Sequence, residues 1–283
     1  MPSLTPETSL RLHLLKAEEF WRADRLELAN AAIRRALEVG IPAGNWYNLQ
    51  RTVEAEYVAR KVSRRMRTEE WLIFETDPDR WASYWSEIVS TVSTAFHELT
   101  DALGVRWAKP VLITIIPDDD WMEFMHSRYG YYTHRAECHK ICLPPSAVRH
   151  IPILCRAARH EIAHAAVNQL AGENVPRWLN EGLAVTLEGP DPHPVSNVVR
   201  MRFGEISAGF ESFNVEIGDD RSQQSYTHSA AIVSSLIASS GMQAIREYLV
   251  AIGKGINPDR AFQTAFGRPL AQAERDWLRG AGN

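Results

Sequence analysis

A pair of histidines, His160 and His164, stands in a stretch of mostly small and apolar residues that is typical of one buried helix, from about 153 to 171. On a helix, residues i and i+4 share a face, so both imidazoles can reach one point in space. Neutral imidazole is a preferred zinc ligand, and the adjacent Glu161 can reach a water molecule as general base. The pattern predicts a central helix that carries a zinc site.

A catalytic zinc site needs three protein ligands and one open position for water. Glu181 is the candidate third ligand, and sixteen residues separate it from His164. This separation allows the first helix to end, a turn at 172–176, and a second helix that returns alongside. The alternative, without a metal, is a pair of helix histidines packed against polar neighbours.

Two side chains near the candidate third ligand could accept a hydrogen bond from a ligand histidine and so orient its imidazole. Glu188 lies seven residues beyond Glu181, two helical turns away on the same face. Its carboxylate could accept a hydrogen bond from a histidine N–H, although a solvated surface glutamate is the alternative. Asn180 is the second candidate for such a contact.

The composition is that of an ordinary globular protein, with 45% apolar and 23% charged residues in a chain of 283. The net charge of −4 gives no basic footprint, so nucleic acid is not expected as a partner. The longest apolar runs, such as 111–116, have the length of a strand, so no membrane span is expected.

The amino terminus and the cysteines both fit a reducing compartment. Residues 1–7 lack a basic segment followed by an apolar stretch, which is the pattern of a secretory signal. Three cysteines are few and odd in number, so no disulfide framework is implied. A cytoplasmic location is therefore expected.

Periodicity and turn residues predict a helical amino-terminal part, a mixed middle part and an all-helical carboxy-terminal part. The strand at 111–116 is apolar throughout, so we expect it at the centre of a sheet. The expected helices are 9–40, 46–67, 79–103, 118–125, 153–171, 227–239, 241–252, 259–266 and 270–279; the expected strands are 71–75, 111–116 and 140–143; and 126–140 and 195–225 are expected to be loops.

Two motifs of this chain together resemble the paired zinc signature of the gluzincin metallopeptidases: His-Glu-Ile-Ala-His at 160–164 and Trp-Leu-Asn-Glu-Gly-Leu-Ala at 178–184. Gluzincins have a thermolysin-like catalytic domain of the peptidase MA type. The form is especially similar to that of M1 aminopeptidases. Residues 131–143 nevertheless lack the Gly-Ala-Met-Glu-Asn segment that reads a free amino terminus in M1 enzymes. The smaller bacterial peptidase-MA-like proteins are therefore the closer comparison, and aminopeptidase specificity is not carried over.

The resemblance implies that His160, His164 and Glu181 bind one Zn²⁺ and that Glu161 is the catalytic base. It also implies that 141–143 is the edge strand beside the cleft, against which an extended peptide could pair. Gluzincins often place a tyrosine or histidine downstream of the third ligand to stabilise the oxyanion, and Tyr226 is our first candidate for that role. Its alternates are His228 and Tyr132, and the alternative for Tyr226 is a packed aromatic ring at a helix start.

The fold that we expect is α+β, with a small sheet over the helix of His160 and a helical carboxy-terminal half. The expected domains are a helical amino-terminal extension, residues 1–67, and a zincin-like metallopeptidase domain, residues 68–283. The sequence does not indicate an oligomeric state or the function of the extension.

These observations favour a zinc metallopeptidase that hydrolyses peptide bonds in a peptide or protein substrate. Two alternatives stay open. One is a catalytically silent protein that binds zinc as a scaffold, and the other is a zinc hydrolase with a substrate other than a peptide. An intact Glu161 argues against the scaffold, because a purely structural site has no need of that carboxylate.

Overall fold

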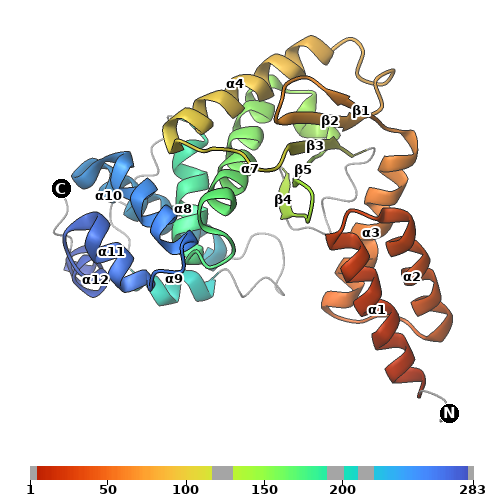
Figure 1. Cartoon of the computed structure of the whole chain (residues 1–283), viewed down its shortest axis with the longest axis horizontal. Helices are drawn as coiled ribbons and strands as arrows, with labels where there is room; N and C mark the ends of the chain where they lie inside the picture. The colour runs from red at the N-terminus through yellow and green to blue at the C-terminus, as the bar shows by residue number, and fades with distance from the viewer. Residues whose placement is uncertain (1–4, 117–129, 190–200, 210–219, 280–283) are drawn as a thin grey trace. The chain divides into compact units, whose positions relative to one another are not determined.

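The computed structural model describes residues 5–116, 130–189, 201–209 and 220–279, and the chain forms two compact units. Unit 1 comprises residues 1–91 and 109–154, and unit 2 comprises residues 92–108 and 155–283. The expected mixture of helices with a small sheet is confirmed (Figure 1). The domain boundary after residue 67 stays a prediction.

Three helices open unit 1: α1 (Pro6–Arg22), α2 (Leu26–Val39) and α3 (Asn45–Val62). The prediction of one helix over 9–40 was wrong, because the chain breaks at Asp24, which has φ +56. A non-glycine residue in this left-handed region cannot continue a helix. Small and apolar side chains fill the space between these helices, namely Leu14, Ala17, Ala29, Ala32, Ile33, Ala36 and Val53.

The sheet of unit 1 has five strands: β1 (Arg64–Arg67), β2 (Leu72–Thr76), β3 (Val111–Ile115), β4 (Tyr131–His134) and β5 (His139–Leu143). Their order is β1-β2-β3-β5-β4. β2, β3 and β5 are parallel, and β1 and β4 pair antiparallel at the two edges. The central position expected for β3 is confirmed, and all five of its residues are buried.

Three sequence predictions about this sheet were wrong. Residues 64–67, expected to continue a helix, form β1, and residues 131–134, expected in a loop, form β4. β4 covers β5, so 141–143 lies inside the sheet and is not its edge. Successive tyrosines and a threonine favour a strand, and the short turn closed by Arg135 N and Cys138 O (3.0 Å) lets the chain pair with itself.

A network of charged side chains joins the amino-terminal helices to this sheet. We call it the buried charge network, and its members are Asp24, Glu56, Arg60, Arg65, Glu75, Arg135 and Lys140. Glu56 of α3 lies at its centre, with Arg135 Nη2 at 2.7 Å and Lys140 Nζ at 2.6 Å, and these three side chains are 0% exposed. Each buried charge therefore has an opposite charge in contact, as burial in a poorly polar interior demands.

Two carboxylates of this network, Glu56 and Asp24, have lowered pKa values. Burial raises the pKa of Glu56, but Arg135, Lys140 and a hydrogen bond from Tyr131 outweigh that effect and hold it at about 2. Burial likewise raises the pKa of Asp24, while Lys140, Arg60 and Arg65 bring it down to about 2. Both groups are consequently ionised in the folded protein at neutral pH.

Unit 2 is helical. Helices α4 (Trp85–Leu103) and α7 (Ile151–Ala171) each begin in unit 1 and continue into unit 2. The short helix α6 (Pro145–Val148) precedes α7. The other helices are α8 (Arg177–Leu187), α9 (Phe203–Gly209), α10 (Asp220–Gly253), α11 (Pro258–Phe266) and α12 (Leu270–Arg279). Figure 1 shows α8 beside α10 and α11 beside α12.

The helices of unit 2 depart from the predictions in the stretch before residue 226. The two helices expected at 227–239 and 241–252 are confirmed, because Gly241, within the element labelled α10, has non-helical backbone angles (φ 78) that divide it into two helical segments. The stretch 195–225, expected as a loop, contains α9, whose Phe203 and Ile206 are buried in the core with Trp178 of α8. The helix expected at 118–125 lies outside the described residues.

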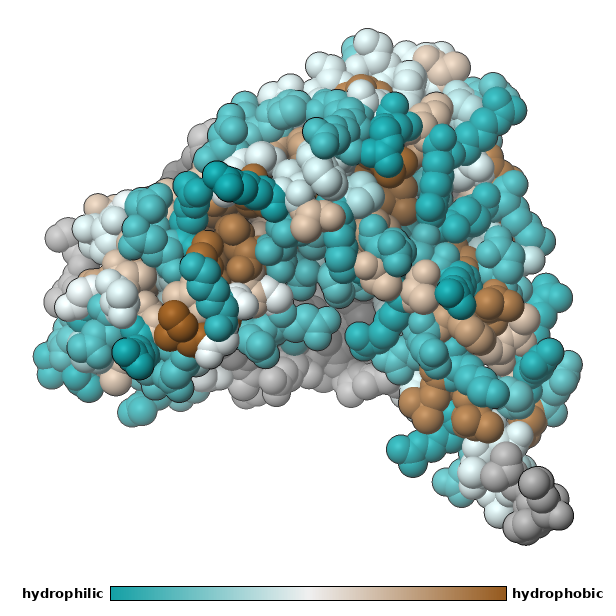
Figure 2. Space-filling view, in the orientation of Figure 1, coloured by the Kyte–Doolittle hydropathy of each residue, from teal (hydrophilic) through white to brown (hydrophobic). Residues whose placement is uncertain are grey.

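Exposed apolar side chains gather on the amino-terminal helices and the turns beside them. Figure 2 shows hydrophobic residues at the surface over this region. They include Leu12, Leu15, Leu28, Leu37, Val39, Ile41, Val58 and Val62. Among the described helices, none combines the length and the apolarity needed to cross a membrane.

Candidate metal centre

Three side chains of unit 2 converge as the sequence predicts: His160 and His164 from α7, and Glu181 from α8. The two Nε2 atoms lie 3.1 Å apart. Glu181 Oε2 lies 3.5 Å from His164 Nε2 and 4.0 Å from His160 Nε2. Ligands on a tetrahedral zinc ion, with bonds of about 2.0–2.1 Å, are separated by about 3.3 Å. These residues could hold such an ion with small adjustments.

The other nitrogen of each imidazole already has an acceptor. His160 Nδ1–H donates to Glu188 Oε1 at 2.6 Å, and His164 Nδ1–H donates to Asn180 Oδ1 at 3.0 Å. A neutral imidazole carries one proton, so these contacts leave both Nε2 atoms with a lone pair. Two lone pairs 3.1 Å apart repel unless a proton or a metal ion lies between them. The donor set therefore fits a metal ion.

The position of Glu181 follows from how α8 packs. Trp178, Leu179 and Leu183 are buried in the core of unit 2, which turns the opposite face of the helix, with Glu181, towards the histidines. Gly182 lies against α10, where an added Cβ would be 2.5 Å from the carbonyl oxygen of Ser229. Only glycine allows this close approach of the two helices.

Glu161 is buried, at 4% exposed, beside the two histidines. Burial raises its pKa above the ordinary value, His160 and His164 lower it, and Glu181 and Glu188 raise it again. For His160, burial lowers the pKa, but the hydrogen bond to Glu188 and the charges of Glu161 and Glu181 raise it to about 9. Without a metal, the surrounding carboxylates thus favour a cation at this point.

The three candidates for oxyanion stabilisation have different surroundings. Tyr226, in α10, is half-buried; burial raises its pKa, and Glu181 is the largest charge effect on it. It therefore lies within electrostatic range of Glu181. His228 is 1% exposed and its Nδ1–H donates to the carbonyl oxygen of Gln224 at 2.7 Å. Tyr132 belongs to unit 1, where its hydroxyl contacts His139 Nδ1 at 3.0 Å.

Sequence reasoning missed two arginines of α7 that contact the end of α8. Arg156 forms an ion pair with Glu188 through Nε and Oε2. Arg159 Nε donates to the carbonyl oxygen of Leu187 at 2.7 Å, and its Nη1 pairs with Glu98 of α4. One signal was available: Arg156 stands four residues before His160, on the same helical face.

The comparisons with known proteins agree with this geometry at the level of the family. A family model described as the Peptidase MA superfamily matches residues 91–280, more than half of the chain. No curated protein and no solved structure gives a significant match. The matched region contains α7, α8 and α10, which carry the converging side chains. The chain therefore belongs to the Peptidase MA superfamily, as its paired histidine and glutamate motifs lead one to expect.

Proposed function

We propose that this chain is a zinc-dependent peptidase of the gluzincin type, in which His160, His164 and Glu181 hold one Zn²⁺. The observation that carries the proposal is the convergence of their three ligand atoms, all within 4.8 Å of one another. The acceptors at both Nδ1 atoms support it, because a neutral imidazole that donates from Nδ1 has its lone pair on Nε2, where a metal can bind. Membership of the Peptidase MA superfamily supports peptides or proteins as the substrate.

A zinc ion at this site would supply Lewis acidity, which lowers the pKa of water and polarises a carbonyl group. Glu161 takes the proton from the attacking water and passes it to the leaving amine. Glu161 follows His160 directly on α7, and because its side chain is buried it is shielded from bulk water. The Tyr226 hydroxyl donates a hydrogen bond to the developing oxyanion, which would be worth a few kcal/mol.

A thermolysin-like arrangement of the catalytic part belongs to the same proposal. A small mixed sheet, a long helix with the two histidines, and a following helix with the glutamate occur in that order along the chain. The helical segment after them, from α9 to α12, corresponds to the helical half that such a domain requires. In this arrangement Glu188 and Asn180 orient the two ligand histidines.

The test replaces the base and keeps the ligands. The Glu161→Gln variant should bind zinc as the natural protein does, while its turnover of peptides falls by about 10²–10⁴-fold, the usual contribution of a general base. Metal analysis and cleavage of a broad peptide library give the two readouts. Glu173→Gln is a matched control, because Glu173 is an exposed glutamate just beyond the end of α7.

Two outcomes would contradict the proposal. In the first, zinc-loaded Glu161→Gln cleaves peptides as fast as the natural protein, so that Glu161 is not the base. In the second, the natural protein binds zinc with this site and cleaves no member of the library. That second result would favour the zinc-binding scaffold or a hydrolase of other substrates.

A further inference from the structure

Glu188, which accepts the hydrogen bond from His160, stands at the end of α8, where the helical hydrogen-bond pattern stops. It is the C-cap of α8, and its backbone N–H reaches Val185 O at 3.3 Å. Gly189, with φ 157, follows at once and takes the chain away from the helix. The last turn of a helix has unsatisfied carbonyl groups and frays readily.

The carboxylate of Glu188 also has an internal freedom that the helix cannot remove. The last side-chain torsion of a glutamate is broad and roughly two-fold, so either oxygen can point in many directions. Contact at 2.6 Å between Oε1 and His160 Nδ1 therefore calls for a second anchor on the same carboxylate. An anchor on Oε2 would fix the plane of the group.

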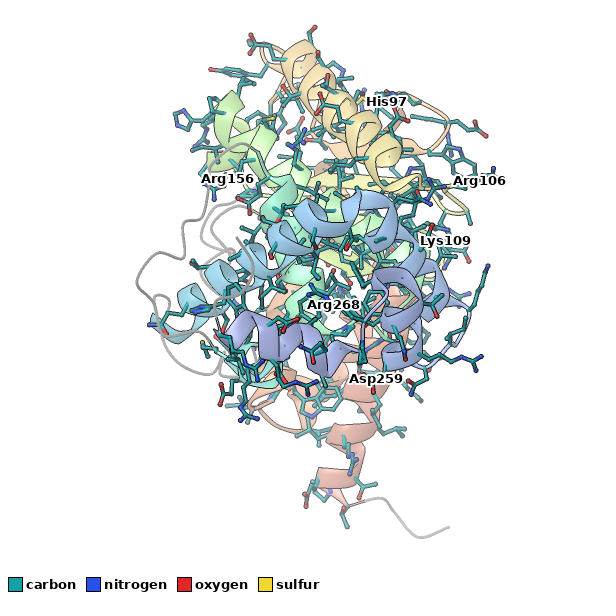
Figure 3. The ribbon with its side chains drawn as sticks, turned by 90° about the vertical axis from the view of Figure 1, so that its left-hand side faces the viewer. His97, Arg106, Lys109, Arg156, Asp259 and Arg268 are labelled. Atoms are coloured by element: carbon teal, nitrogen blue, oxygen red, sulfur yellow. The ribbon has the colours of Figure 1, made fainter. Side chains whose placement is uncertain are left out.

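Arg156 supplies that anchor. Its Nε–H donates to Glu188 Oε2, while Oε1 receives the proton of His160, so each oxygen has its own partner. Arg156 and His160 lie four residues apart on α7 and so share one face of that helix. Figure 3 shows Arg156 on α7, and its side chain is 40% exposed at the edge of the centre.

The backbone next to Glu188 is held by the neighbouring arginine. Arg159 Nε donates to the carbonyl oxygen of Leu187 at 2.7 Å, which satisfies one of the open carbonyl groups at the end of α8. The other end of the same guanidinium pairs with Glu98 of α4. Arg159 thus holds the backbone just before Glu188 in place, and Arg156 sets the orientation of the Glu188 carboxylate.

We propose that Arg156 is a positioning residue of the metal centre, which orients Glu188 so that His160 keeps its proton on Nδ1 and offers Nε2 to the metal. The inference rests on the proposed function only in that it takes His160 as a metal ligand. Arg156 contacts the centre through Glu188, and its proposed effect on the metal passes through that carboxylate. Its removal should weaken metal binding without disturbing the rest of unit 2.

The experiment measures the affinity of the full chain for Zn²⁺, by competition with a chromogenic chelator. Loss of a group that orients a metal ligand typically costs 10–100-fold in affinity, so Arg156→Ala should bind zinc about tenfold more weakly. Glu188→Ala should lose as much or more. The double variant should bind zinc no more weakly than Glu188→Ala, because the proposed effect of Arg156 passes through Glu188.

A matched control is available in the same unit. Arg268 is 36% exposed and pairs with Asp276, its Nη1 lying 3.1 Å from Oδ2. Figure 3 labels both arginines, and Arg268 lies between α11 and α12. Arg268→Ala should leave the zinc affinity unchanged. Arg156→Lys should recover part of the lost affinity, because the contact with Glu188 uses a single N–H that an ammonium group can replace.

Cobalt provides a spectroscopic readout that a general loss of stability would not change. With Co²⁺ in place of Zn²⁺, the visible spectrum reports the geometry of the ligands. Saturated Arg156→Ala should show an altered spectrum, and saturated Arg268→Ala the spectrum of the natural protein. Equal zinc affinity and equal spectra for Arg156→Ala and the natural protein would overturn the inference.

The two proposals fail in distinguishable ways. If Glu161→Gln retains hydrolysis, the proposed function fails, while the affinity of Arg156→Ala still tests the inference. If Arg156→Ala and Glu188→Ala have additive effects on zinc affinity, the inference fails, while the proposed function stands.

Discussion

Both units of this protein bury charged side chains, but they balance the charges differently. In unit 1 the carboxylates Asp24, Glu56 and Glu75 all contact arginine or lysine side chains of the buried charge network. In unit 2 the candidate metal centre gathers Glu161, Glu181 and Glu188, and Glu188 is the one that pairs with Arg156. Glu161 and Glu181 interact instead with two imidazoles, of which His160 has its pKa raised to about 9 by the surrounding carboxylates.

This difference in charge balance indicates that the charges of unit 1 stabilise the fold, whereas those of the candidate metal centre serve to bind a ligand. A set of charges that is complete in itself gains nothing from a ligand, so the buried charge network serves to hold helices against a sheet. A set with more negative than positive charge, with lone pairs aimed at one point, becomes stable when a cation arrives. Three experiments sharpen or break this comparison.

The largest effect should come from zinc. At free zinc about 1,000 times the dissociation constant, binding adds about 4 kcal/mol to the free energy of unfolding. We expect hydrogen exchange of amides around His160, His164 and Glu181 to slow accordingly, and a chelator to reverse the change. Amides around Glu56 and Lys140 should exchange as before. Equal slowing in both units would show that they unfold as one body, and the comparison would fail.

The next effect comes from opening the buried charge network. Lys140→Met leaves the buried Glu56 with Arg135 but without its ammonium partner, and should lower the free energy of unfolding by about 3 kcal/mol. Urea denaturation measures it. Arg22→Met is the control, because it breaks an ion pair with Glu18 whose arginine is 59% exposed, and exposed pairs contribute below about 1 kcal/mol. Similar losses in both variants would contradict the closed network.

The smallest effect is the response to acid. The folded pKa values of Asp24 and Glu56, about 2, lie below the ordinary values of 3.8 and 4.5. As pH falls, the unfolded chain therefore takes up these protons first, and folding loses stability. The contribution is complete above about pH 4.5 and is lost as pH falls towards 2, with Glu56 alone accounting for on the order of 2 kcal/mol by pH 3.

Unfolding free energies measured between pH 5 and pH 2.5 check this sign. The Glu56→Gln variant should be less stable at pH 5 and should show a smaller loss on acidification, because it has one fewer proton to bind. An unchanged slope in this variant would mean that Glu56 is not held in its ionised form by Arg135 and Lys140.

The candidate metal centre was largely predictable from sequence because its residues lie in short motifs with regular spacing. The spacing of His160 and His164 places both on one helical face, and the family match confirms the resemblance drawn from these motifs. Glu188 and Asn180 were proposed as histidine partners, and each lies within hydrogen-bond distance of one. Arg156 escaped notice because its contact lies across two helices.

The fold of unit 1 was less predictable because its organising contacts are distant in sequence. β4 and β1 are short, and only pairing with β5 and β2 gives them strand geometry. Asp24, where the helix breaks, contacts Arg60 and Arg65, which lie far along the chain. A buried lysine such as Lys140 looks like an ordinary polar residue until Glu56 is placed beside it.

Glu56 also limits how early during synthesis the amino-terminal helices can reach their final packing. It reaches Lys140 across 84 residues and Arg135 across 79, so both partners are synthesised well after α3. A nascent chain that ends near residue 67 holds the carboxylates of Asp24 and Glu56 with no Arg135 or Lys140 to receive them. Contacts this distant form late and slow folding. The amino-terminal helices should therefore reach their final packing only after β5 has left the ribosome.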